Sequence, residues 1–170
     1  MTHPGPPPTL DPRAATLIEQ LGLAPHPEGG HYRELFRSPS KVQPGDDRPA
    51  RNALTTIYFL LPAGEHSRWH RVRSDEVWHL YEGGPIELLL SPPGFAAVER
   101  VLLGPPGSTL GPCHTVPAGW WQAARPRGAY ALAGCTVAPG FEFADFGFLR
   151  ESPEELARLR ALSPELARLA

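Results

Sequence analysis

The stretch GEHSRWHRVRSDEVWHLYEG, residues 64–83, holds two of the chain's seven histidines close to an Asp-Glu pair. His70 and His79 flank Asp75 and Glu76, and a glycine stands at each end of the stretch. Imidazole and carboxylate groups together can bind a transition metal or exchange protons with a substrate. The same residues also suit a polar turn between two strands. The elements around the stretch must decide among these three interpretations.

The composition favours many short strands joined by tight turns. The chain has 22 prolines and 17 glycines among 170 residues, and proline is excluded from helix interiors and from central strands. The hydrophobic fraction of 41% comes in strand-length runs, which argues against a disordered chain. This length suits one well-buried domain. We therefore expect a single domain over residues 10–170, preceded by a disordered tail over residues 1–9.

Charge and cysteine content exclude several function classes. Sixteen Lys and Arg stand against eighteen Asp and Glu, without the basic face that nucleic acid requires. No apolar run approaches the roughly 20 residues that span a bilayer, and no secretory signal is visible. Cys113 and Cys135 are too few for a disulfide framework. We expect a cytoplasmic protein with reduced cysteines and with neither nucleic acid nor membrane as a partner.

Helices are expected only near the two ends of the chain. Asp11 is a candidate N-cap and Gly22 a stop for the first helix, while Ser152 begins a capping-box pattern for the second. The segment 41–51 is expected to be a mobile loop. Short apolar runs between turn signals predict strands at 31–37, 54–61, 68–73, 76–81, 86–90, 98–103, 120–125 and 129–137. Strands at such spacing indicate a sandwich or a barrel.

Two spaced patterns connect the opening stretch to a known family. They resemble the two motifs of the cupin superfamily, G-x5-H-x-H-x3-E-x6-G and G-x5-P-x-G-x2-H. The seven matching positions are Gly64, His70, Glu76, Gly83, Gly111, Pro117 and Gly119. The resemblance implies an all-β fold, an antiparallel jelly-roll barrel with short flanking N- and C-terminal helices.

The resemblance also implies where a metal would be held. A cupin holds its metal with three imidazoles and a carboxylate, but here Val72 takes the second histidine position and Gln122 the last one. Valine cannot bind a metal, and a neutral amide is a weak ligand for zinc-like ions. His70, Glu76 and Gln122 are therefore the candidate metal ligands. His79 joins them only if a bulge turns it, because it lies three residues from Glu76. The expected cofactor is none or a divalent metal.

Three longer blocks narrow the resemblance to a small cupin subfamily that carries a domain-of-unknown-function label. The blocks are HPEGGHYRELFRS, SDEVWHLYEGGPIELLL and GCTVAPGFEFADF, within a match of about residues 17–149. The subfamily is described as often dimeric and as akin to sugar-nucleotide epimerases and isomerases. Strand 31–37 is free to pair across a two-fold axis, and strand 54–61 is apolar on both faces. We therefore expect a homodimer.

The first function that the residues allow is a metal-independent epimerase or isomerase. It would act on a small polar molecule, either carbohydrate-like or nucleotide-sugar-like. Such an enzyme needs a base with a pKa near neutrality and an acid opposite it. His70 or His79, poised by Asp75 or Glu76, is the candidate base. The candidate acids are Tyr58 and Tyr130.

Two other functions stay open at this stage. One is a metal-dependent cupin enzyme, which needs a third strong ligand. The other is a non-catalytic protein that binds a small molecule, with His70, Glu76 and Gln122 as polar anchors. The apolar wall of that binding site would be formed by Trp69, Trp78, Trp120, Trp121 and Phe141.

Overall fold

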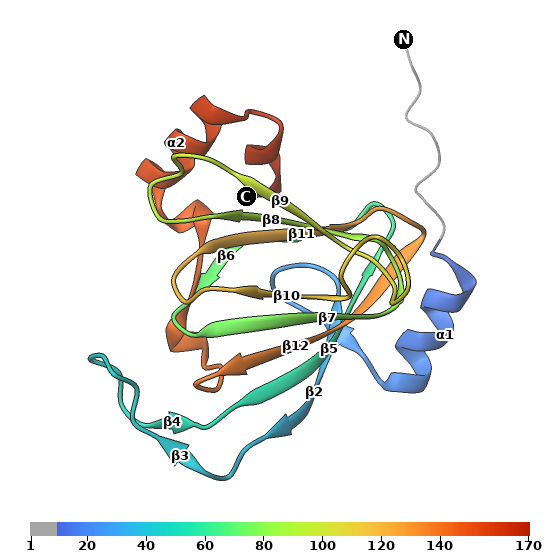
Figure 1. The fold of residues 1–170 in the computed structure, drawn as a ribbon, viewed down its shortest axis with the longest axis horizontal. Coiled ribbons are helices and arrows are strands. Elements are labelled where there is room, and N and C mark those ends of the chain that lie inside the picture. Colours follow the sequence, from blue (N-terminus) through green and yellow to red (C-terminus); the bar gives the residue numbers. More distant parts are fainter. Residues whose placement is uncertain (1–9) are drawn as a thin grey trace.

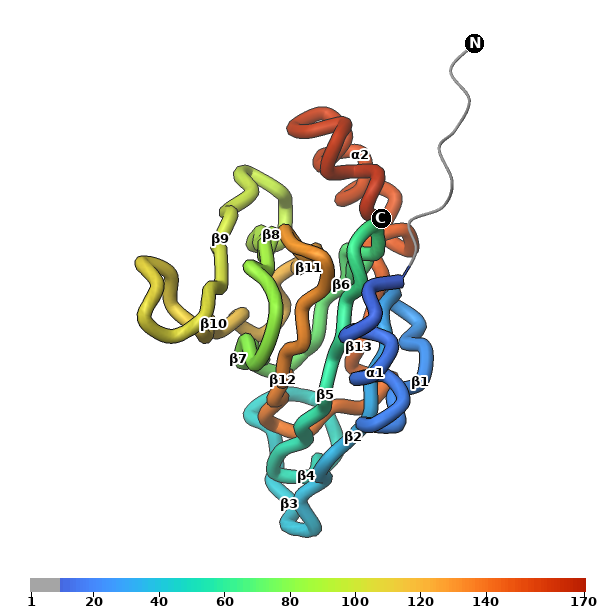
Figure 2. The backbone as a smooth tube through the Cα atoms, turned by 90° about the vertical axis from the view of Figure 1, so that its right-hand side faces the viewer, coloured from blue at the N-terminus to red at the C-terminus, as the bar shows by residue number. Residues whose placement is uncertain are grey.

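The computed structural model describes residues 10–170 and contains two antiparallel sheets that face each other (Figures 1 and 2). The larger sheet contains, in spatial order, β1 (Ala24–Pro25), β2 (His31–Arg37), β5 (Thr55–Pro62), β12 (Tyr130–Ala138), β7 (Asp75–Gly83) and β10 (Cys113–Val116). The smaller sheet contains β13 (Phe146–Phe148), β6 (Ser67–Val72), β11 (Trp121–Pro126), β8 (Ile86–Ser91) and β9 (Glu99–Leu103). The predicted antiparallel jelly-roll barrel is confirmed.

Helices flank the sheets near both chain ends. In α1 (Pro12–Leu21), the Asp11 carboxylate accepts the backbone N–H groups of Arg13 and Ala14, and Gly22 ends the helix at φ 61°. These ends are the predicted ones. α2 (Pro153–Leu162) begins after Ser152, but the hydroxyl makes no capping bond, so the expected capping box is not formed. Three short 3-10 helices complete this set, η1 (Phe143–Asp145), η2 (Leu149–Glu151) and η3 (Leu166–Leu169). No helix within residues 10–170 is long and apolar enough to cross a membrane.

All eight predicted strands are present, with ends within two residues of the prediction. β10 and β13 were not predicted, because both are short and lie beside turn or aromatic segments without a clear alternation. The expected disordered tail, residues 1–9, lies outside the described residues.

The segment 41–51, predicted as a mobile loop, is a loop over residues 43–50 that two short strands close. This segment forms a hairpin of β3 (Lys41–Val42) and β4 (Arg51–Asn52), which projects from one end of the molecule (Figure 2). The polar sequence suggested a solvated loop, but Arg51 and Arg48 are buried against Asp145. Arg51 donates two hydrogen bonds to the Asp145 carboxylate, through Nε at 2.8 Å and through Nη2 at 2.9 Å. A partner 94 positions away fixes the segment.

The interior between the sheets has two unlike halves. The filled half is a packed apolar core that includes Phe59, Leu61, Trp78, Leu80, Ile86, Leu88, Leu90, Val116, Ala124, Ala131 and Ala133. The open half contains a cavity that lies at the opposite ends of the same strands. On β5, for example, Leu61 belongs to the filled half, whereas Thr55 and Ile57 line the cavity. Because alternate strand residues share a face, one strand supplies both halves.

Candidate functional site

The cavity in the open half has a volume of about 110 Å³, measured to the centres of water-sized spheres. Its wall is largely apolar and includes Ile57, Phe59, Val72, Val137, Phe141, Phe143 and Phe146. Four polar side chains at its buried end, here termed the floor, are His26, Glu28, His70 and Glu76. Three charged side chains that are less buried than the floor, here termed the rim, are Glu34, Arg37 and Glu142. The cavity is therefore an apolar chamber with a titratable floor.

Glu28 reaches the floor from the turn between β1 and β2. Gly29 and Gly30 follow it at φ 112° and 69°, where a Cβ atom would lie 2.2 Å from the His66 carbonyl oxygen and 2.6 Å from that of Leu60. Only glycines let the turn lie this close to the neighbouring backbone. The Glu28 carbonyl oxygen accepts the Arg68 N–H at 2.8 Å, and its carboxyl group accepts the Ser67 hydroxyl at 2.9 Å.

The protonation of the His70 ring follows from its neighbours. Nδ1 lies 2.7 Å from the Arg68 carbonyl oxygen, which can only accept, so Nδ1 carries the proton. Nε2 therefore presents its lone pair 3.4 Å from Oε2 of Glu28. Phe146 stacks on the ring with a centroid distance of 5.2 Å, and only 2% of the residue is exposed. The imidazole is thus fixed in one orientation with its acceptor nitrogen toward Glu28.

Glu76 belongs to a hydrogen-bonded chain that links the floor to the filled half. Gln122 donates through Nε2 to Glu76 Oε2 at 2.6 Å, and its Oε1 accepts the Trp78 indole N–H at 3.0 Å. The indole can only donate, which fixes the orientation of the Gln122 amide and leaves its N–H group for the carboxylate. The Cys135 thiol also lies beside Glu76 and lines the cavity.

Burial sets the protonation of the floor. It raises the pKa of Glu28 to about 8, against the opposing effect of the Ser67 hydroxyl. It also raises the pKa of Glu76 to about 7, where His70 opposes the shift and Glu28 adds to it. Burial lowers the pKa of His70, and it lowers that of His26 to about 4. The 3.6 Å contact between His26 and Glu28 is therefore not an ion pair at neutral pH.

The residues do not fit the metal group of the fold. Val72 lines the cavity and offers no ligand atom. The Oε1 atom of Gln122, its only metal-binding atom, already accepts the Trp78 N–H. Within residues 10–170, no three His, Cys, Asp or Glu side chains are placed to hold a metal ion together. Of the expected metal ligands, only His70 and Glu76 remain, which is fewer than the metal group of the fold requires.

The structure brings together part of the predicted site. His70, Glu76 and Phe141 line the cavity, and Gln122 contacts it through Glu76. Trp78 belongs to the core of the filled half but holds Gln122. These five residues come from the stretches of both sequence motifs and from the block GCTVAPGFEFADF.

Several predicted site residues lie elsewhere. His79 alternates with Glu76 and Trp78 on β7 and faces the outside of the barrel, and the register shift of β7 comes only after Leu80, so it does not turn His79 inward. Asp75 accepts the Ala118 N–H at 2.8 Å in the turn of the second motif. The expected pairing of His79 with Asp75 as a base is therefore not formed.

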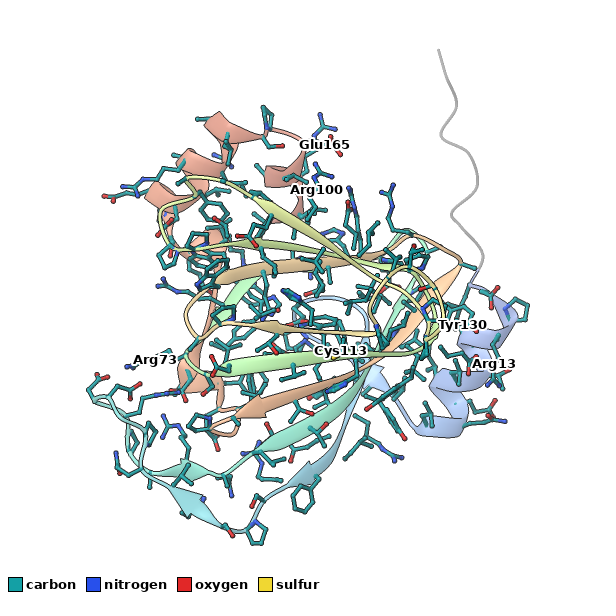
Figure 3. The ribbon with its side chains drawn as sticks, viewed as in Figure 1. Arg13, Arg73, Arg100, Cys113, Tyr130 and Glu165 are labelled. Carbon is teal, nitrogen blue, oxygen red and sulfur yellow. The ribbon has the colours of Figure 1, made fainter. Side chains whose placement is uncertain are left out.

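The two candidate tyrosine acids also lie outside the cavity. The Tyr130 hydroxyl donates to Glu82 at 2.7 Å, and Glu82 also accepts from Arg13. Figure 3 shows Tyr130 and Arg13 at the α1 side of the molecule. Tyr58 packs with the cluster beneath α1 and meets Tyr81 edge-to-face. Neither hydroxyl reaches the floor.

Three tryptophans of the expected apolar wall serve as core instead. Trp69 and Trp121 are fully buried among the C-terminal helices, and the Trp69 indole donates to the Leu166 carbonyl oxygen at 2.9 Å. Trp120 packs against the filled half. The wall is formed by phenylalanines of the segment 141–146, of which only Phe141 was predicted.

Sequence reasoning missed two residues of the floor. Glu28 lies within the block HPEGGHYRELFRS, but neither Glu28 nor His26 was among the predicted site residues. The available signal was an acidic residue directly before two glycines, a combination that permits close backbone approach. It did not indicate which surface the turn would contact.

The barrel and its floor define a cupin-type protein: a jelly roll whose interior carries the histidine and glutamate of the first cupin motif. More narrowly, the chain belongs to the DUF985 family of the cupin superfamily, whose model matches residues 15–149. No curated protein matches the sequence.

Solved structures agree with this membership. A hypothetical protein from Leishmania major is 31% identical, with a TM-score of 0.79, 91% of this chain and 96% of that chain covered. A protein from Shewanella oneidensis is also 31% identical, with a TM-score of 0.79 and coverage of 92% and 96%. A cupin 2 conserved barrel domain protein from Rhodopseudomonas palustris shares the fold at 18% identity and a TM-score of 0.56, with 83% and 79% covered.

Proposed function

We propose that this protein binds a small polar molecule in the open half and transfers a proton on it without a metal, as an epimerase or isomerase does. The observation that carries the proposal is the pair of buried carboxyl groups, Glu28 and Glu76, beside the fixed imidazole of His70. General acid–base catalysis is most effective when the pKa of the group lies near the working pH. The pKa values of about 8 and about 7 meet this condition.

The two carboxyl groups suit opposite roles at neutral pH. Glu76 has the lower pKa and is the candidate base, which removes a proton from carbon beside a carbonyl group. Glu28 remains mostly protonated and is the candidate acid, which donates a hydrogen bond to the carbonyl oxygen. Glu76 then returns the proton to the neighbouring carbon of the enediol, while Glu28 gives its proton to the first oxygen and takes one back from the second, which completes an aldose–ketose isomerisation and restores both groups. A carbohydrate-like or nucleotide-sugar-like substrate has the carbonyl chemistry that these steps need.

The test is hydrogen exchange in heavy water. Chelator-treated protein is incubated with aldohexoses and nucleotide-linked sugars, and loss of individual C–H signals is followed by proton NMR. We expect exchange at one carbon, and at least about a 100-fold loss of its rate in Glu76→Gln. Glu99→Gln changes an exposed glutamate on β9 and serves as the matched control. Exchange that is unaltered in Glu76→Gln would contradict the proposed role.

A second function, binding without catalysis, is favoured by the aromatic side chains at the mouth. Phe141, Phe143 and Phe146 form a wall that suits an apolar ring face. This alternative predicts that a ligand protects Cys135, which lines the cavity, from a thiol reagent while no C–H exchange occurs.

We also propose a cytoplasmic location. Cys113 and Cys135 form no disulfide, and Cys113 is exposed. Unpaired exposed thiols persist in reducing compartments. Mass spectrometry of alkylated protein from unbroken cells, with both thiols labelled, tests this proposal.

A further inference from the structure

Three hydrogen-bond donors at the floor are already engaged. The Ser67 hydroxyl binds Glu28, the Gln122 amide binds Glu76, and Nδ1–H of His70 binds the Arg68 carbonyl oxygen. The acceptors are not used up in the same way. Apart from the Cys135 thiol beside Glu76, no donor within residues 10–170 hydrogen-bonds the second oxygen of either carboxyl group or Nε2 of His70. These open acceptors suit a ligand that brings donors of its own.

The charge of the lining has one dominant sign. Two carboxyl groups on the floor and two on the rim, Glu34 and Glu142, stand against a single arginine, Arg37. Its guanidinium group already binds Glu34 and Glu142, each at 2.9 Å, and the Phe141 carbonyl oxygen at 3.1 Å. An anionic ligand would meet repulsion and find no free arginine donor. A cation meets attraction from the ionised carboxyl groups, and its approach favours ionisation of Glu28 and Glu76 as well.

The wall beside the floor suits the same ligand. Phe141 and Phe143 meet edge-to-face at 5.1 Å, and Phe146 lies 6.0 Å and 6.4 Å from them. Aromatic faces attract cations and also pack against apolar ligand surface. Tyr32, His26 and Cys135 complete the titratable groups of the lining.

We propose that the ligand of this cavity carries a protonated amino or amidine group, which contacts Glu28, Glu76 and His70 while the rest of the molecule packs on the phenylalanine wall. This inference rests on the proposed function and narrows its substrate class. Amino sugars present such a group together with hydroxyl donors, whereas sugar phosphates and uronic acids place negative charge where the lining is acidic.

Proton release accompanies the binding of such a cation. A positive group between two carboxyl groups favours their ionised forms. At pH 7.5 the floor holds protons, since Glu28 has a pKa of about 8. Binding therefore expels part of these protons into the buffer, and the measured enthalpy depends on the ionisation enthalpy of that buffer.

The experiment is isothermal titration calorimetry with two matched series at pH 7.5, in phosphate and in Tris. The first series is glucosamine, glucose and glucuronate; the second is benzylamine, benzyl alcohol and benzoate. We expect each amine to bind at least about 10-fold more tightly than its neutral analogue, a difference of about 1.4 kcal/mol. We expect the anions to bind least, and only the amines to release protons.

Variants locate the effect on the floor. Glutamine resembles a protonated carboxyl group, so Glu28→Gln and Glu76→Gln keep the floor's packing and its hydrogen-bonding shape. Each variant should remove the preference for the amine and the proton release, while Glu99→Gln retains both. Neutral or anionic analogues that bind as tightly as the amines overturn the inference. C–H exchange in a neutral sugar, without any preference for the amine, would also overturn the inference about the ligand but would support the proposed function. Absence of both binding and exchange overturns the two together.

Discussion

The filled and open halves of the barrel are made by the same strands and yet differ in chemistry. On β7, Leu80 and Trp78 point into the filled half, and two residues further along the same face Glu76 points into the open half. On β12, Ala131 lies in the core, whereas Cys135 lies at the boundary, because it belongs to the core and also lines the cavity. The hydrophobic effect alone would continue the apolar face to the end of each strand. The change to polar residues on β7 is therefore not explained by packing alone, and it agrees with the proposed function.

Placing carboxyl groups in the open half costs folding free energy, and the structure reduces this cost. Burying a carboxyl group is unfavourable unless it is protonated or hydrogen-bonded. Glu28 and Glu76 meet both conditions, with raised pKa values and one hydrogen bond each from Ser67 and Gln122. The open half is thus less stable than the filled half at high pH but retains groups that can exchange protons.

The largest expected effect compares two aliphatic side chains of equal size. Leu88 is fully buried in the filled half, and Leu88→Ala should lower the free energy of unfolding by about 2–5 kcal/mol. Ile57 lines the cavity, and Ile57→Ala should cost about 1 kcal/mol, because the side chain already borders empty space. Urea unfolding of both variants measures the difference. Equal losses would contradict the distinction between the halves.

The second effect is a loss of stability at rising pH that originates in the open half. Between pH 4.5 and 6.5 the buried carboxyl groups keep protons that the unfolded chain releases, which lowers stability as pH rises. His26 and His70 have lowered pKa values and act in the opposite direction over this range. The two contributions largely cancel there.

Above pH 6.5 the carboxyl groups dominate, because the unfolded chain loses most of its histidine protons by about pH 7.5. The free energy of unfolding should therefore fall by about 2 kcal/mol between pH 6.5 and 8, where Glu28 at last ionises in the folded protein. Urea midpoints across this range measure the fall. Glu28→Gln should remove most of it and Glu76→Gln a smaller part, with Glu99→Gln as the control. A wild-type free energy of unfolding that does not change between pH 6.5 and 8 would contradict this prediction.

A third experiment converts the open half into a metal site. The double variant Val72→His, Gln122→His supplies the two imidazoles that the first and second cupin motifs would contain at these positions. With His70 and Glu76 it should bind a divalent transition metal and gain about 2.7 kcal/mol of stability at a metal concentration 100 times the Kd. Elemental analysis after dialysis against zinc compares it with the wild-type chain, which should retain little metal. Stoichiometric zinc in the wild-type protein would contradict the conclusion that its residues do not suit a metal.

The smallest expected effect on stability concerns the open half's outer strand. β2 carries the rim residues Glu34 and Arg37, and it exposes Leu35 and Phe36 on its surface. We propose that this strand pairs with a second copy, so light scattering at low micromolar concentration should give twice 18.5 kDa. Phe36→Asp should give the monomer mass with the interior intact. A wild-type mass of 18.5 kDa rules out the stable dimer.

The motif spacing explains how much of the open half could be predicted. His70, Glu76 and Gln122 were found through the resemblance to the cupin motifs, whose spacing reflects strand alternation and fixed turn lengths, which are set by residues near one another in the chain. The same alternation placed His79 on the outer face unless a bulge intervened. The filled half was predictable in outline for the same reason, since its apolar runs mark the strands.

Only the tertiary structure decided which distant segments complete the site. The turn at Gly29 and Gly30 brings Glu28 to within 3.4 Å of His70, 42 positions along the chain, and no local periodicity encodes that contact. The segment of the phenylalanine wall likewise contains Asp145, which Arg48 and Arg51 hold from 97 and 94 positions away. Sequence by itself determined the barrel and the motif side of its floor. The second carboxyl group, and with it the acid–base pair, arises only when the sheets close, because burial and proximity are properties of the folded chain.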